Sequence, residues 1–242
     1  MNPEVKELII EGKDKSVFTT DSPDVVIVRY KDRISAFHNI KRASIKDKAE
    51  VNCKITTLLY EYLAGNGVPT HFIEKVSDTE QACRKVAIIP IQFVVRNWIA
   101  GSTAKLLHVE SGMKPSNVIY ELRYNSAEAA FPMINQHHAV ALGLVTYDEL
   151  QKIFSLIGKA NEHLLKLFGD AGIKLVDYKL ECGRTSDGEI IIADEFSPDT
   201  CRLWDAETGD SMDKDRFRRD LGGVIDAYRQ VLERLTKLME GK

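Results

Sequence analysis

Apolar and charged residues alternate strictly from Val176 to Cys182, which is typical of a β-strand with one buried face. Asp187-Gly188 follows this strand and predicts a hairpin turn, because glycine adopts positive φ angles without steric cost. A second strand-like run covers residues 189–196. The pattern therefore predicts a β-hairpin in the C-terminal half of the chain.

This hairpin places charged residues opposite one another. With a two-residue turn, Glu181 faces Asp194 and Lys179 faces Phe196. Opposed side chains have Cβ atoms roughly 4.5–5.5 Å apart, and like charges at that distance are unfavourable. A hard cation such as Mg²⁺ between the two carboxylates relieves this repulsion, and Mg²⁺ in proteins usually also holds substrate phosphates. The alternative is a solvated strand face, because a slip of one residue separates the two carboxylates.

The remaining pattern indicates a mixture of strands and helices. Short apolar runs bounded by turn residues predict strands over 5–11, 16–20, 25–30, 70–76 and 85–97. Apolar residues at helical spacing predict helices over 54–64, from Thr146 to Gly169 and over 214–239. Residues 31–51 are polar and are expected to form a surface loop. The expected fold class is α+β.

Two further segments carry groups suited to anions. Gly12, Lys13 and Lys15 lie in the first predicted turn, where backbone N–H groups and two cations suit a polyphosphate, although turns often carry such residues only for solubility. Arg96 ends the apolar run that contains Pro90, a position expected at a strand end, edge or bulge. A short helix follows with Ser102 or Thr103 as its N-cap, and a helix start beside an arginine suits an anion.

Composition narrows the class of protein. The chain has 242 residues, of which 44% are hydrophobic and 29% charged, as in ordinary globular proteins. The formal net charge of −3 provides no basic field for nucleic acid or an anionic membrane, and no apolar run reaches the length of a membrane span. Four scattered cysteines and the lack of a signal peptide suggest reduced thiols and a cytoplasmic location.

Five sequence runs then resemble one enzyme family over essentially the whole chain: EGKDKSVF (11–18), VVRNWIAGS (94–102), LVDYKLECG (175–183), ADEFSPDTCRLWD (193–205) and MDKDRFRRDLGG (212–223). They are similar to the phosphoribosylaminoimidazole-succinocarboxamide synthase family of purine biosynthesis. The resemblance implies an N-terminal antiparallel sheet subdomain (1–90) and a larger α+β domain (91–242). The nucleotide cleft between them is related in outline to ATP-grasp and kinase-like folds.

The resemblance also implies roles for individual residues. The glycine hairpin with Gly12, Lys13 and Lys15 covers the ATP phosphates, Ile88 lies at the adenine, and Arg123 stands where relatives often have a lysine near the nucleotide. Glu181 and Asp194 hold Mg²⁺, and Lys179 lies beside the transferred phosphate. The residues expected at carboxyaminoimidazole ribotide and in the polar wall of its site are Arg96, Ser102, Arg202, Asp177 and Asp199.

The implied reaction uses ATP to convert the ribotide carboxylate to an acyl phosphate, which the amino group of L-aspartate then attacks. The expected partners are these small molecules and a second copy of the chain in a homodimer, with no nucleic acid and no membrane. Two other functions use similar parts. A small-molecule kinase passes the phosphoryl group to a hydroxyl and has no need of L-aspartate. A nucleotide-binding regulatory module tolerates the loss of Lys179.

Overall fold

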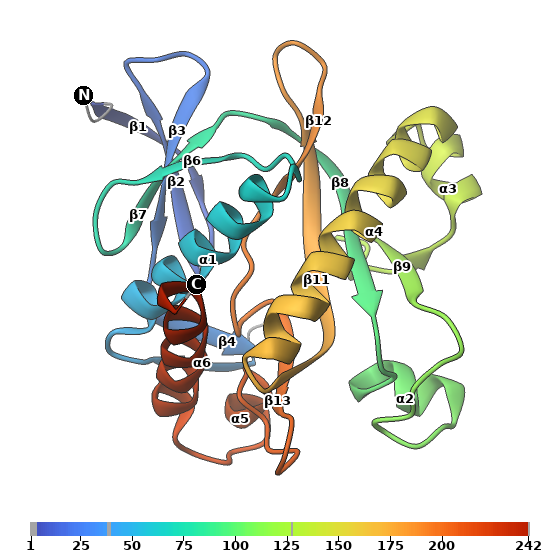
Figure 1. Cartoon of the computed structure of the whole chain (residues 1–242). Coiled ribbons are helices and arrows are strands. Elements are labelled where there is room, and N and C mark those ends of the chain that lie inside the picture. Colours follow the sequence, from blue (N-terminus) through green and yellow to red (C-terminus); the bar gives the residue numbers. More distant parts are fainter. Residues whose placement is uncertain (1–3, 38–39, 127, 242) are drawn as a thin grey trace.

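The computed structural model describes residues 4–37, 40–126 and 128–241, so His38 and Asn39 of the early loop lie outside it. A five-stranded antiparallel sheet is built from the N-terminal part of the chain (Figure 1). Its strands, in spatial order, are β1 (Val5–Glu11), β2 (Lys15–Thr20), β3 (Val25–Tyr30), β7 (Glu80–Arg84) and β6 (Phe72–Lys75). The first three were predicted within one residue, whereas β7 was not predicted.

A second antiparallel sheet carries most of the predicted site. Its strands are β10 (Met133–Ile134), β9 (Ile119–Tyr124), β8 (Ala87–Arg96), β11 (Ile173–Arg184) and β12 (Ile190–Ala193), and β13 (Cys201–Asp205) also pairs with β11. Strand β11 is therefore central, with β8 on one side and both β12 and β13 on the other. The register of β8 against β11 shifts around Pro90, which confirms the expected bulge.

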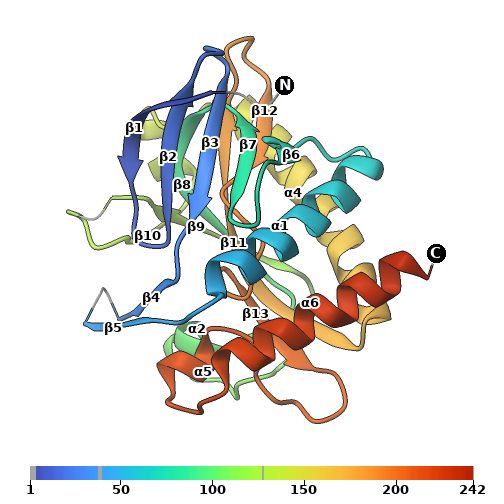
Figure 2. The same cartoon turned by 90° about the vertical axis from the view of Figure 1, so that its left-hand side faces the viewer.

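Helix α1 (Lys48–Gly65) lies between the two sheets (Figures 1 and 2). Ala49 and Cys53 pack in a small core with β3 and β7, while Ile55 and Leu59 belong to the main core with the second sheet. A helix with buried residues on several faces carries little amphipathic signal, which explains why only residues 54–64 were predicted as helix. The main core thus includes residues on both sides of position 90, and the proposed domain division there stays a prediction.

Three other helices complete the main framework. Helix α4 (Tyr147–Asp170) packs on β11 and β12, and α6 (Val224–Glu240) packs on α1 (Figure 2). Thr146 caps α4 as predicted. The short helix α2 (Gly101–Leu107) has Ala100 as its N-cap, two residues before Ser102, and has no side-chain cap. The expected capping role of Ser102 or Thr103 is therefore wrong, because Thr103 Oγ1 instead bonds Glu121 at 3.0 Å.

Two predicted segments differ from the structure. The expected loop over 31–51 contains the hairpin of β4 (Arg33–Ala36) and β5 (Lys41–Ser44) as well as the start of α1. The expected helix over 214–239 is broken into α5 (Asp215–Arg218) and α6. Gly222 and Gly223 between them both have positive φ, which ends a right-handed helix. The segment 112–143, where no strand or helix was predicted, contains β9, β10 and α3 (Gln136–Ala141).

All four cysteines are buried and free. Within the described part of the chain, no helix is both long and apolar enough to cross a membrane.

Glu149 links the start of α4 to β11 and predicts how stability depends on pH. Its carboxylate accepts two hydrogen bonds from Arg184, at 2.6 and 3.0 Å, and these contacts lower its pKa from 4.5 to about 2. A carboxyl group whose pKa is lowered by folding stabilises the protein at pH values above its unfolded-state pKa. This stabilisation is lost as the pH falls through the folded-state pKa. We expect the free energy of unfolding to fall less in Glu149→Gln than in the unaltered protein as the pH is lowered from about 5 to about 2.

Urea unfolding at several pH values measures this effect. Glutamine keeps the backbone cap at Thr146, so a change in helix capping does not confound the comparison. Equal pH dependence of the variant and the unaltered protein would contradict the prediction.

Candidate active site

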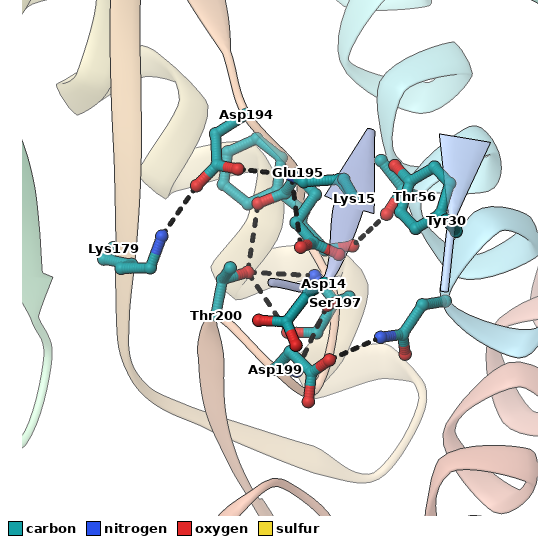
Figure 3. Close-up of polar contacts among 12 residues, drawn as sticks. Asp14, Lys15, Tyr30, Thr56, Lys179, Asp194, Glu195, Ser197, Asp199 and Thr200 are labelled. Carbon is teal, nitrogen blue, oxygen red and sulfur yellow. Dashed lines mark hydrogen bonds and ion pairs between the residues drawn. The ribbon is translucent and has the colours of Figure 1, made fainter. Parts of the chain in front are cut away.

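Two lysines share one carboxylate at the centre of the site (Figure 3). Lys15, at the start of β2, forms an ion pair with Asp194, and its Nζ lies 3.2 Å from Glu195 Oε1. Lys179 Nζ, on β11, lies 2.7 Å from Asp194 Oδ2. With Glu181, these residues form what we call the lysine–carboxylate cluster. It joins the N-terminal sheet to the second sheet at the residues predicted for phosphate and metal chemistry.

The register of the β11–β12 hairpin differs by one residue from the prediction. Glu181 lies opposite Ala193 and not opposite Asp194. The reason is the turn: Thr185 N–H donates to the Glu189 carbonyl at 3.0 Å, which leaves three residues in the loop in place of two. The expected direct pairing of the two carboxylates is therefore wrong.

Asp194 nevertheless reaches the cluster because the strand ends at Ala193. Asp194 has a φ of 71°, a left-handed conformation that aspartate tolerates better than most residues. This breaks the side-chain alternation and allows the carboxylate to contact Lys179. Lys179 does not face Phe196 either: its N–H donates to the Thr200 carbonyl at 3.0 Å, because the chain after Asp194 leaves the sheet before returning as β13.

The charges in the cluster are unevenly balanced. Burial alone would raise the pKa of Asp194, but the ammonium groups of Lys15 and Lys179 hold it well below its usual range. The pKa of Glu181 is raised, first by burial and then by the negative charge of Asp194. Asn125 Nδ2 donates to Glu181 Oε1 at 2.9 Å, but it adds no positive charge. Glu181 thus lies where a further cation would be stabilised.

The carboxylates of the lysine–carboxylate cluster are suited to a Mg²⁺ ion that binds together with ATP. Among residues 4–37, 40–126 and 128–241 there is no group of three or more histidine, cysteine, aspartate and glutamate side chains that could hold a metal. Mg²⁺ usually binds proteins through one or two carboxylates, with phosphates and water as its other ligands. Glu181 and Asp194 supply two such carboxylates, and burial followed by the negative charge of Asp194 raises the pKa of Glu181.

A second group, the arginine cluster, lies at the end of β8. The buried guanidinium of Arg96 donates to both carboxylate oxygens of Glu121, at 2.6 and 2.9 Å, and to Asp177 Oδ2 at 2.8 Å. Arg202 pairs with the same oxygen of Asp177 and donates to Asp215 Oδ2 at 2.8 Å. The structure therefore brings Arg96, Asp177 and Arg202 together, as three different strands meet here.

The start of α2 touches this cluster. Gly101 has a φ of 61°, and a Cβ at this position would lie 2.7 Å from Arg202 Nη2. A residue with a side chain is thus excluded by both the backbone conformation and the close approach of Arg202. Ser102, the next residue, is exposed.

Asp199 lies in a separate, fully buried network. Its Oδ2 accepts hydrogen bonds from Lys48 Nζ at 2.6 Å and Asn52 Nδ2 at 2.8 Å, both on α1, and its Oδ1 accepts one from the Tyr228 hydroxyl of α6 at 2.8 Å. Lys214 Nζ is 3.9 Å from Oδ1. These contacts fasten the loop between β12 and β13 to two helices.

The Asp199 network yields a stability prediction with an internal control. We expect Tyr228→Phe to lower the free energy of unfolding by about 1.5–3 kcal/mol, because it deletes one hydrogen bond to a buried carboxylate. The hydroxyl of Tyr178 is also buried but has no hydrogen-bond partner among the residues that the structure describes. Tyr178→Phe should therefore change stability by less than about 1 kcal/mol in the same urea titration. Similar losses in the two variants would argue against the network.

The other predicted residues are more dispersed. Gly12 lies in the β1–β2 turn, where a Cβ would lie 2.7 Å from the Lys15 carbonyl oxygen. Lys13 is exposed and lines a cavity whose lining does not include Asp194. Ile88 is 39% exposed on β8, and Arg123 Nη2 lies 3.3 Å from Glu121 Oε2.

Sequence reasoning missed several residues that hold the site together. They are Lys48, Asn52, Glu121, Asn125, Glu195, Lys214, Asp215 and Tyr228. Only Glu195 had a local signal, since it follows Asp194 directly in the sequence. For the others, no local pattern of hydrophobic and polar residues indicated a role in the site.

Comparison with known proteins gives one consistent result. The model of the SAICAR synthetase family matches residues 8–235. A phosphoribosylaminoimidazole-succinocarboxamide synthase from Fusobacterium nucleatum is 49% identical over 231 residues, which are 96% of this chain and 98% of the relative. The crystal structure of the synthase from Ehrlichia chaffeensis has a TM-score of 0.93 and 42% identity, covering 95% of this chain and 98% of that one. A SAICAR synthetase in complex with ADP has a TM-score of 0.92 and 41% identity, covering 96% and 98%.

The family match spans nearly the whole length, and relatives of the same name share both the sequence and the fold. The chain belongs to the SAICAR synthetase family.

Proposed function

We propose that the lysine–carboxylate cluster is the catalytic centre of an ATP-dependent carboxylate–amine ligase. The enzyme joins L-aspartate to the carboxylate of carboxyaminoimidazole ribotide and forms the succinocarboxamide of purine biosynthesis. The observation that carries this assignment of the centre is the carboxylate of Asp194 held between Lys15 and Lys179 in a member of the family.

The reaction needs activation because a carboxylate is a poor electrophile. The terminal phosphoryl group of ATP passes to a carboxylate oxygen of the ribotide, and ADP leaves. The amino group of L-aspartate then attacks the acyl carbon, loses a proton and displaces inorganic phosphate, forming the amide. Phosphoryl transfer depends mainly on alignment and on neutralisation of charge.

Lys15 and Lys179 are suited to that neutralisation. Their pKa values are raised because the nearby carboxylates outweigh the effect of burial, so both remain cationic at neutral pH. We expect Lys179 to lie at the transferred phosphoryl group and Lys15, with Gly12 and Lys13 of the hairpin, to face the ATP phosphates. Ile88 and Arg123 are the proposed contacts to the rest of the nucleotide.

Glu181 and Asp194 are the proposed ligands of Mg²⁺, which would neutralise phosphate charge when it is bound with ATP. Asp194 already contacts two lysines, so it orients them as well. Asn125 fixes one oxygen of Glu181 and leaves the other without a hydrogen bond from the described residues.

The ribotide residues divide into two groups in this proposal. Arg202 and Ser102 are the proposed contacts to the ribotide, because the guanidinium of Arg202 approaches Gly101 at the start of α2 and the next residue, Ser102, is exposed. Arg96 and Asp199 have their polar atoms occupied by buried partners. Their proposed role is to hold Arg202 and the β12–β13 loop in place, and Asp177 connects Arg96 to Arg202.

We also propose a homodimer that acts in the cytoplasm. The support is the resemblance described above together with four buried free thiols, which are compatible with reducing conditions. Light scattering on the purified protein tests the dimer.

The assay that tests the function measures phosphate release from MgATP with the ribotide, with and without L-aspartate, followed by mass analysis of the product. We expect phosphate and the succinocarboxamide only when all three substrates are present. ATP binding without turnover would overturn the ligase assignment, and ADP formation with a hydroxyl acceptor in the absence of L-aspartate would favour the kinase alternative.

A further inference from the structure

Two consecutive carboxylates after β12 reach the same ammonium group. Asp194 forms an ion pair with Lys15, and Glu195 Oε1 lies 3.2 Å from Lys15 Nζ (Figure 3). In a regular strand, successive side chains point to opposite faces, so neighbouring carboxylates do not share one partner. Here the strand ends at Ala193, and the left-handed backbone of Asp194, with a φ of 71°, turns the chain. This turn brings both carboxylates to Lys15.

The two carboxylates differ in their other partners. Asp194 also pairs with Lys179, whereas Lys15 is the one cation within 4 Å of Glu195 among the residues that the structure describes. The side chain of Glu195 is 4% exposed, and its buried Oε2 has no hydrogen-bond partner in the described part of the chain. A buried carboxylate without a counter-charge is strongly unfavourable. Glu195 therefore depends on Lys15, while Asp194 has a second cation beside it.

The proposed role of Asp194 as a Mg²⁺ ligand changes the charges that face Lys15. A divalent cation at this carboxylate would offset the negative charge that attracts Lys15 and would repel its ammonium group. Glu195 is not among the proposed metal ligands, so its charge would remain available to Lys15.

The exposure of the two side chains suits such a division. Glu195 is almost fully buried, whereas the side chain of Lys15 is 18% exposed. The ammonium group of Lys15 carries three N–H donors, so it can contact a phosphate while it stays paired with Glu195. A buried carboxylate behind a partly exposed lysine thus fixes the position of the cation without competing for the substrate.

We propose that Glu195 is a positioning residue, which holds the ammonium group of Lys15 at the ATP phosphates when Asp194 binds Mg²⁺. The proposal rests on the function proposed above and deepens it. It gives the two neighbouring acids different tasks: Asp194 serves the metal and Lys179, and Glu195 serves Lys15. Glu195 acts through Lys15 and touches neither the metal nor a substrate.

Calorimetric titration of ADP into the protein, once with excess Mg²⁺ and once with EDTA, tests the proposal. Glu195→Gln keeps the size of the side chain but removes its charge. With Mg²⁺, we expect the Kd for ADP to rise about tenfold or more, because Lys15 loses its remaining carboxylate. With EDTA, the Kd should change by less than about threefold, because Asp194 is then free to hold Lys15. A merely structural role of Glu195 would weaken both titrations equally.

Glu80→Gln is the matched control, because Glu80 is an ion-paired glutamate on β7 that contacts Arg29 at 2.6 Å. It should leave both titrations unchanged. Glu195→Asp keeps the charge on a shorter side chain and should give a smaller loss, again only with Mg²⁺; it replaces Glu195→Gln if thermal unfolding shows that variant to be unfolded. Equal weakening with and without Mg²⁺, or unchanged affinity in both, would overturn the proposal. Unaltered protein that does not bind ADP with Mg²⁺ would instead overturn the proposed function.

Discussion

Lys179→Met should lower kcat by about 10²–10³-fold or more while the protein remains folded. Removal of a single group that stabilises transition-state charge costs about this much in other enzymes. Lys179 Nζ is 2.7 Å from Asp194, and its side chain is 35% exposed, so it can reach a substrate phosphate without unfolding the strand. Asp194 would still be paired with Lys15 in the variant. Phosphate release under saturating substrates measures the effect.

Lys152→Met is the control, because Lys152 is an exposed lysine of α4 away from the site. It should retain the kcat of the unaltered protein. Thermal unfolding of both variants shows whether the fold is intact. A Lys179→Met enzyme with kcat within tenfold of the unaltered protein would exclude Lys179 from the chemical step.

Arg96→Met should lower the free energy of unfolding by about 3–5 kcal/mol, the range for breaking a buried ion pair by removing one partner. The side chain of Arg96 is 6% exposed and contacts two buried carboxylates, Glu121 and Asp177. Methionine fills much of the volume but leaves both carboxylates without this cation. Asp177 would keep Arg202, whereas Glu121 would keep the Thr103 hydroxyl and, as its one cation among the described residues, Arg123, whose contact is 3.3 Å long.

Arg123→Met provides the matched comparison at the same carboxylate. Arg123 is 28% exposed, so its loss should cost less than about 1 kcal/mol. Urea unfolding of the two variants measures the difference. Equal losses would mean that burial does not determine the strength of these contacts and would remove Arg96 from its proposed positioning role.

Much of the secondary structure followed from local pattern. The alternation from Val176 to Cys182 predicted the centre of β11, and Thr146 marked the start of α4. The secondary-structure predictions were wrong where the backbone geometry is irregular. The turn after Arg184 has one more loop residue than predicted, and the consecutive glycines before Val224 interrupt the last helix.

Only part of the candidate site could be predicted from the sequence. Lys15, Lys179 and Asp194 were identified and lie together, although the hairpin register used to argue for the metal was wrong by one residue. Arg96 was identified as an anion-binding residue, but it is surrounded by carboxylates that the sequence pattern did not link to it. Lys48 lay in a segment predicted as a surface loop, yet its ammonium group is buried against Asp199.

The sequence by itself determined the α+β class, four of the five strands of the first sheet, three of the six strands of the second sheet, the long helix α4 and the family to which the chain is similar. These features depend on residue spacing and on propensities of neighbouring residues, which act over a few positions. Only the tertiary structure decided which charges meet. Lys15 and Asp194 are 179 positions apart, so their contact depends on the packing of both sheets around α1 and on the left-handed backbone at Asp194.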